Sequence, residues 1–184
     1  STRKQIKRDY LIFIYLVYYG FKSLHSLFFL QFYCMLKLNF PDCDIKVKLK
    51  QNKPYVFDVV RKKWIRLTPE EWVRTHCIQF LNQQKNFPIS LLRIEQQFNV
   101  FDRQKRFDLI ACNSKQEPLV LVECKSPEVK IRQNTFDQLS RYNVVLKSPY
   151  SMITNGLNHY FYTVNFDNQS FQFIEELPNY NELK

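Results

Sequence analysis

Two acids and a lysine stand near the ends of two successive apolar segments, and they are the residues best suited to chemistry. Asp108 lies in segment 106–112, and Glu123 and Lys125 close segment 119–125. Two carboxylates can bind Mg²⁺, or Mn²⁺ in its place, through hard oxygen ligands while the metal keeps several waters. A bound metal polarises a phosphodiester and lowers the pKa of a water, and a lysine can neutralise charge that develops on the phosphate.

A plainer explanation competes, because an E-x-K tripeptide is common and usually forms a surface ion pair of little energetic consequence. Here, however, the segment LVLVECK is apolar on both faces until its end, which is typical of a central strand covered on both sides. A charged pair on such a strand is costly unless it has a function. Strand side chains alternate, so Glu123 and Lys125 share a face, and a short turn allows Asp108 to lie beside them.

The elements that must position these residues can be predicted from local patterns. A helix is expected to begin at Thr68, followed by proline at the first helical position and Glu71 at the capping-box position. A second capping box at 135–138 predicts a helix that ends near Lys147. Strands are expected at 45–49, 56–60, 64–67, 92–100, 106–112, 119–125, 151–154, 160–165 and 171–174. This order indicates an α/β (α+β) fold with a mixed central β-sheet flanked by helices.

Three motifs in this order resemble the PD-(D/E)xK nuclease superfamily: RFDLI at 106–110, LVECK at 121–125 and QLSRY at 138–142. The last is similar to the Q-x-x-x-Y element of the RecB-like branch. The stretch from LTPEEWVR at 67–74 to TNG at 154–156 resembles, more closely, the N-terminal nuclease domain of type I restriction enzyme R subunits, especially its short stand-alone versions. The resemblance implies a restriction-endonuclease-like fold and a metal-dependent DNA endonuclease.

The resemblance also implies a role for each residue of the motif. Asp108 and Glu123 would be metal ligands in the catalytic site, and Lys125 would be the catalytic lysine. An acid early in the first helix often completes such a site. Glu70 fits that pattern better than Glu71, whose place in the capping box already explains its presence.

The resemblance places further residues at the DNA-facing rim of the site. Gln138 and Tyr142 are four residues apart and therefore share a helical face, and Arg141 lies between them. A capping glutamine and a core tyrosine are the plainer interpretation of this pair. The basic residues that flank the motif either line a phosphate-binding rim or form an ordinary solvated face; these are Lys105, Arg106, Lys130, Arg132 and Arg141.

Composition limits the classes of function. The 184 residues fit one domain, and a formal net charge of +10 favours an anionic partner such as nucleic acid or a membrane surface. Two glycines leave neither a dinucleotide fingerprint nor a P-loop. We therefore expect that any motor, like any specificity subunit, is on another chain. The alternative is that this protein is a non-catalytic DNA-binding module of the same fold. Five cysteines without a C-x-x-C indicate reduced thiols and a cytoplasmic protein.

The first 34 residues differ from the rest. Apolar runs at 10–21 and 27–36 are separated by polar residues, whereas a spanning helix needs roughly 20 mostly apolar residues. Three explanations stay open: a natural start at Met35, a membrane-associated segment at 10–36, and a packed N-terminal helix. The expected organisation is thus an apolar, basic extension at 1–34 and a nuclease-like domain at 35–184.

Overall fold

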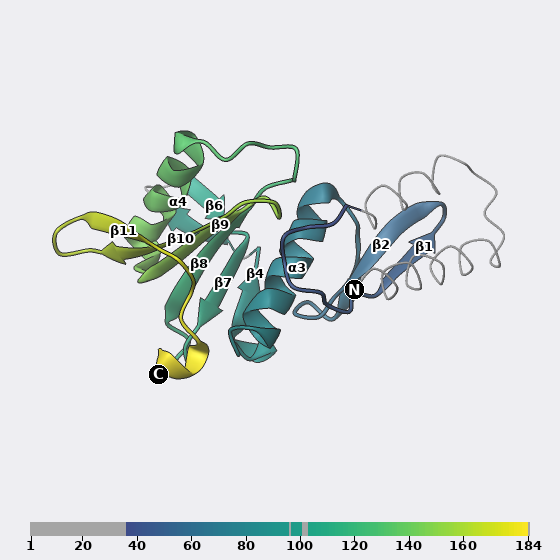
Figure 1. Cartoon of the computed structure of the whole chain (residues 1–184), viewed down its shortest axis with the longest axis horizontal. Coiled ribbons are helices and arrows are strands. Elements are labelled where there is room, and N and C mark those ends of the chain that lie inside the picture. Colours follow the sequence, from purple (N-terminus) through teal and green to yellow (C-terminus); the bar gives the residue numbers. More distant parts are fainter. Residues whose placement is uncertain (1–35, 96, 101–102, 184) are drawn as a thin grey trace.

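The computed structural model describes residues 36–95, 97–100 and 103–183 (Figure 1). The extension predicted at 1–34, and all but one residue of the membrane-associated segment predicted at 10–36, lie outside these ranges. Within them, no helix combines the length and the apolar character needed to cross a lipid bilayer. The elements are β1 (Val47–Lys50), β2 (Lys53–Asp58), β3 (Lys63–Arg66), α3 (Pro69–Gln83), a 3₁₀ turn (Ile89–Leu91), β4 (Leu92–Ile94), β5 (Gln97–Val100), β6 (Arg103–Arg106), β7 (Leu109–Cys112), β8 (Pro118–Cys124), α4 (Gln133–Leu146), β9 (Tyr150–Thr154), β10 (His159–Asn165), β11 (Ser170–Ile174) and a 3₁₀ turn (Tyr180–Glu182).

A six-stranded sheet in the order β11-β10-β9-β8-β7-β4 forms the centre of the fold. Strands β8 and β9 are parallel, and the other neighbouring pairs in this sheet are antiparallel. The parallel pair requires a crossover connection, which α4 supplies. Figure 1 shows α3 and α4 on either side of this sheet. The predicted mixed sheet flanked by helices is confirmed.

The alternation of side chains along β8 explains why both faces of the sheet are covered. Val120 and Val122 belong to the larger hydrophobic core, which includes Val73 of α3. Leu121 belongs to a second core with Leu139 of α4. A strand buried on both faces is expected to be apolar throughout, so an acid in β8 must find specific partners.

A smaller three-stranded sheet, β1-β2-β3, packs against the outer side of α3. Val56 of β2 is fully buried in the larger core. Figure 1 shows β1 and β2 on the side of α3 away from the central sheet. Helix α3 is therefore packed between two sheets, and its first turn lies near Asp108.

Two predicted strands are broken where they were expected to be continuous. Segment 92–100 divides into β4 and β5 because Glu95 adopts a left-handed backbone conformation, with φ of 50°. Segment 106–112 divides likewise, with β6 ending at Arg106 and β7 beginning at Leu109. Within the described residues, strands β5 and β6 pair only with each other, as a two-stranded sheet. The break leaves Asp108 just before the start of β7.

The two helix starts differ in how well they could be predicted. The hydroxyl of Thr68 accepts a hydrogen bond from the Glu71 N–H at 3.1 Å, and Pro69 is the first residue of α3, as predicted. The capping box predicted at 135–138 is wrong. Helix α4 begins three residues earlier than that box requires, its N-cap Arg132 makes no side-chain cap, and the Thr135 N–H already bonds to the Arg132 carbonyl at 2.9 Å.

Candidate active site

Glu123 lies near the end of β8 and has the same strand parity as Leu121, so it faces α4. Its Oε1 accepts hydrogen bonds from Lys125 Nζ at 2.6 Å and from Gln138 Nε2 at 2.7 Å. The residue is only 4% exposed. A buried carboxylate requires such partners, and here two of the residues singled out by the sequence supply them.

Asp108 ties the start of β7 to the end of β8. Its Oδ2 accepts a hydrogen bond from the backbone N–H of Cys124 at 2.7 Å, and its Oδ1 accepts one from Arg74 Nη2 at 3.0 Å. The structure therefore brings Asp108 directly beside the strand end that carries Glu123 and Lys125.

The first turn of α3 brings Glu70 and Glu71 to the same region through Arg74. Arg74 is 1% exposed, and its guanidinium donates to Glu70 Oε1 at 2.8 Å and to Glu71 Oε1. Glu71 also accepts a bond from Arg61 Nη2 at 3.0 Å, so its carboxylate belongs to an ion-pair network and not to a reciprocal capping box. Glu70 makes only the bond to Arg74 among the hydrogen bonds described, and it is the more available of the two acids.

Arg61 and Glu95 join this network, although neither stood out in the sequence. Arg61 follows β2 and donates through Nε to Asp58 Oδ2 at 2.6 Å and through Nη1 to Glu95 Oε2 at 2.6 Å. Glu95 also lies 3.7 Å from Arg74. The contact between Arg61 and Glu95 joins residues 34 positions apart, and no local spacing signals such a pair.

The acids of the site perturb one another's pKa values. Burial, then the charge of Asp108, raise the pKa of Glu123 to about 7, although Lys125 pulls it down. Burial, then Asp108, likewise raise the pKa of Glu70. Burial lowers the pKa of Lys125, but its bond to Glu123 and the surrounding acids outweigh this, and the net pKa is raised. The site is therefore a repelling set of carboxylates held by a protonated lysine and a buried guanidinium.

This donor set fits a divalent cation by its chemistry. Hard carboxylate oxygens are the ligands that Mg²⁺ prefers, and Mg²⁺ usually takes one or two carboxylates and keeps several waters. The described residues include no group of three or more His, Cys, Asp or Glu side chains arranged to hold a metal ion. Asp108 and Glu123 supply the one or two carboxylates that Mg²⁺ takes. A cation between them would also relieve their mutual repulsion.

The rim residues predicted from the sequence are only partly brought to the site. Gln138 contacts Glu123 directly, and since α4 begins at Gln133, the interpretation of Gln138 as a capping residue is wrong. Tyr142 is half-buried and packs against the second core. Arg141 is exposed, and its Nε donates to the carbonyl of Asp137 at 3.2 Å.

Comparisons with known proteins place these residues in a family. Among solved structures, a fragment described as an HsdR subunit of a type I restriction enzyme from Vibrio vulnificus YJ016 aligns with 18% identity and a TM-score of 0.41. The alignment covers 55% of this chain and 22% of that chain. No curated protein matches the sequence significantly. The family model described as type I restriction enzyme R protein N terminus matches residues 69–178, which include Asp108, Glu123 and Lys125. Because this match spans more than half of the chain, the protein belongs to the family of type I restriction enzyme R protein N termini.

Proposed function

We propose that this domain is a Mg²⁺-dependent endonuclease of the PD-(D/E)xK kind that hydrolyses phosphodiester bonds in DNA. The observation that carries the proposal is the environment of Glu123. A buried acid with a pKa raised to about 7 accepts bonds from Lys125 and Gln138 and lies beside Asp108. Strongly perturbed acids held by a specific cation cluster at functional sites. The family match supports the choice of DNA as substrate.

In this proposal Asp108 and Glu123 would hold the metal, while Glu70, the acid of α3 predicted from the sequence as a further ligand, bonds to Arg74 instead. When bound, Mg²⁺ polarises the phosphodiester and lowers the pKa of a water. Lys125 carries a positive charge at neutral pH, because the neighbouring acids raise its pKa. Its ammonium can therefore stabilise the charge that develops on the phosphate. Gln138 holds Glu123 in one orientation through a bond of 2.7 Å.

Cleavage of a supercoiled plasmid tests this function. The full chain should nick or cut DNA with Mg²⁺ or Mn²⁺ and not with EDTA. Asp108→Asn and Lys125→Met should each lower the rate roughly a hundredfold or more, the size expected when one charge-stabilising group is removed. Asp167→Asn and Lys115→Met make the same chemical changes in exposed turns and should cut like the wild type. Cleavage by both site variants at the wild-type rate would contradict the proposal.

A second candidate is a non-catalytic DNA-binding module that acts with motor or specificity subunits on other chains. One observation favours it: both oxygens of Asp108 are already bonded, one to Arg74 and one to the Cys124 N–H. Salt-sensitive DNA binding without metal-dependent cleavage would select this candidate. Titration calorimetry with Mn²⁺ separates the two further, because only the nuclease requires Mn²⁺ binding that Glu123→Gln abolishes.

A further inference from the structure

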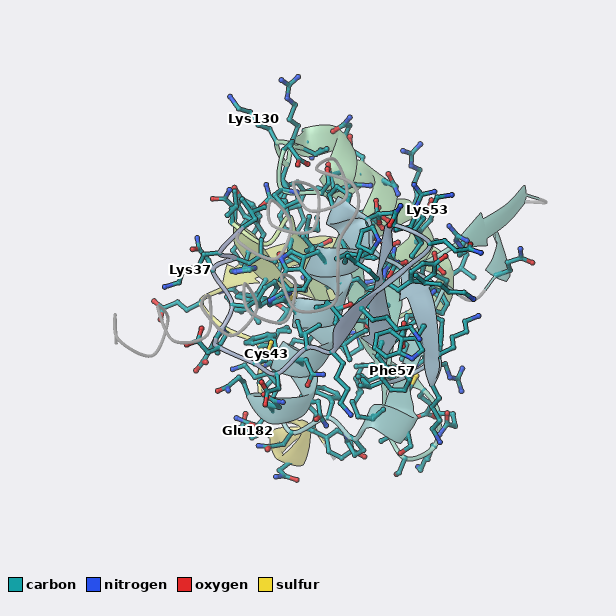
Figure 2. The ribbon with its side chains drawn as sticks, turned by 90° about the vertical axis from the view of Figure 1, so that its right-hand side faces the viewer. Lys37, Cys43, Lys53, Phe57, Lys130 and Glu182 are labelled. Carbon is teal, nitrogen blue, oxygen red and sulfur yellow. The ribbon has the colours of Figure 1, made fainter. Side chains whose placement is uncertain are left out.

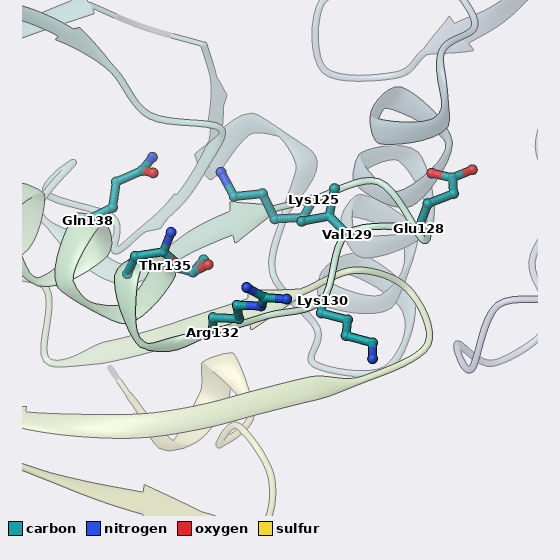
Figure 3. Close-up of a pocket in the computed structure, with 8 residues that line it drawn as sticks. Lys125, Glu128, Val129, Lys130, Arg132, Thr135 and Gln138 are labelled. Atoms are coloured by element: carbon teal, nitrogen blue, oxygen red, sulfur yellow. The ribbon is translucent and has the colours of Figure 1, made fainter.

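A cavity of about 550 Å³ adjoins the carboxylates, between the loop that follows β8 and the first turns of α4 (Figure 3). Two residues connect it to the site: Lys125 and Gln138 line the cavity and both bond to Glu123. The volume is within the range of pockets that hold small organic ligands, so it has room for a sugar-phosphate unit. The other lining residues are Glu128, Val129, Lys130, Arg132, Asn134 and Thr135.

The charges around this cavity favour an anion. The lining includes three basic residues, Lys125, Lys130 and Arg132, and one acid, Glu128. Figure 3 shows the carboxylate of Glu128 turned away from the ammonium of Lys125. Lys130 projects outward from the molecule at the rim (Figure 2). Within the described part of the chain, the side chain of Arg132 has neither an ion pair nor a hydrogen bond. Its charge is therefore available to a ligand.

The loop that carries these cations is fixed by its own bonds. Asn155 Nδ2 donates to the Val129 carbonyl at 3.0 Å, and the Val129 N–H donates to the Ser126 carbonyl at 3.0 Å. Arg132 is the N-cap of α4 but makes no side-chain cap. Its guanidinium therefore serves no purpose in starting the helix, and the loop presents it without a structural partner.

We propose that this cavity binds a backbone phosphate of the DNA strand, next to the phosphate that a metal on Asp108 and Glu123 would hold, with Arg132 as its principal ligand. The inference rests on the proposed function, because it takes DNA as the substrate. A DNA strand with one phosphate at Lys125 must continue past that lysine, and the cavity begins there. Phosphate contacts fix the register of a protein on DNA without reading sequence. The cavity would thus determine which bond of the strand reaches the carboxylates.

Fluorescence anisotropy with a short labelled DNA duplex, in EDTA so that nothing is cut, tests the cavity apart from catalysis. Arg132→Ala in the full chain should weaken binding at low salt by roughly three- to tenfold and reduce the slope of log affinity against log salt by about 0.9. Arg66→Ala is the matched control. Arg66 is also an exposed arginine, and it lies in the small sheet on the other side of α3. Arg132→Lys keeps the charge and should retain most of the affinity.

The outcomes separate the two proposals. If Arg132→Ala lowers affinity and slope while Arg66→Ala does not, the cavity assignment is supported, even if the wild type never cuts DNA and the nuclease proposal fails. If the wild type cuts DNA but the two variants bind alike, the nuclease proposal stands and the cavity assignment is overturned. Failure of the wild type to bind the duplex at low salt also overturns it.

Discussion

Arg74 Nη2 lies 3.0 Å from Asp108 Oδ1, and this bond joins α3 to the start of β7. Arg74 is almost fully buried and contacts further acids, among them Glu70 and Glu71. The pKa of Arg74 is raised, because the charges of Asp108 and its neighbours outweigh the effect of burial. One guanidinium therefore holds both the acid before β7 and the acids of the helix.

Replacing Arg74 with methionine should strongly destabilise the fold. The substitution leaves several acids facing one another without their cation, and breaking a buried ion pair from one side costs roughly 3–5 kcal/mol. Urea denaturation at pH 7 measures the change. Arg66→Met, at an exposed position of β3, should change the free energy of unfolding by less than about 0.5 kcal/mol. Equal effects of the two substitutions would show that the buried network contributes nothing.

Replacing Glu123 with glutamine should stabilise the metal-free protein at high pH only. The pKa of Glu123 is raised from 4.5 to about 7 on folding. Between these values the folded chain binds more protons than the unfolded chain, so the free energy of unfolding falls as pH rises through this window. Glutamine cannot ionise, so the free energy of unfolding of Glu123→Gln should exceed that of the wild type by up to roughly 3 kcal/mol at pH 8.

The same comparison at low pH provides the check. Below pH 4.5 both states of the wild type are protonated at Glu123, and the advantage of the variant should disappear. Urea denaturation in EDTA at pH 4.5, 6 and 8 measures it. Glu175→Gln, at an exposed position, should give a difference that does not vary with pH in this way. A stabilisation by Glu123→Gln that is equal at all three pH values would contradict the raised pKa.

Gln138 should matter for activity through the acid that it contacts. Gln138→Leu removes a donor to Glu123, which favours the neutral acid and raises its pKa further. Loss of a residue that hydrogen-bonds to a metal ligand lowers activity roughly ten- to a hundredfold. The pH at which the cleavage rate rises should also move upward. Gln133→Leu, in the first turn of the same helix, is the control. An unchanged pH profile with lower activity would point to a purely structural role.

Gly156 should not tolerate alanine. Its φ is 83°, and an added Cβ would lie 2.7 Å from Leu38 Cδ2 and 3.1 Å from Val73 Cγ2. Left-handed backbone and overpacking together should cost roughly 2–4 kcal/mol in urea denaturation. In a double-mutant cycle, Leu38→Ala should relieve the steric part, so the double variant should lose less than the sum of the single variants. Strict additivity would mean that only the backbone is strained.

The hairpin that carries the acids could be predicted because its signals are local. Apolar strands flank a polar turn, and the predicted strand 119–125 differs by one residue at each end from β8 at Pro118–Cys124. The alternation along that strand predicted that Glu123 and Lys125 share a face, and their bond of 2.6 Å confirms it. The nearness of Asp108 followed from the short turn.

The rest of the site could not be predicted, since it depends on contacts between distant elements. Arg61 did not stand out in the sequence, yet its partners include Glu71 and Glu95. The left-handed conformation of Glu95 occurs without glycine, so the break between β4 and β5 had no signal. The Thr135-to-Gln138 pattern matched a capping box by spacing alone; the structure places Thr135 inside the helix.

The crossover between the parallel strands β8 and β9 also determines when the site is assembled. The turn between β7 and β8 is short, whereas Arg74 and Gln138 arrive from helices that need longer loops to close, at greater entropic cost. We expect the hairpin to form first, so Asp108 and Glu123 meet before either helix docks. Their repulsion would then be relieved only when Arg74 of α3 docks against Asp108.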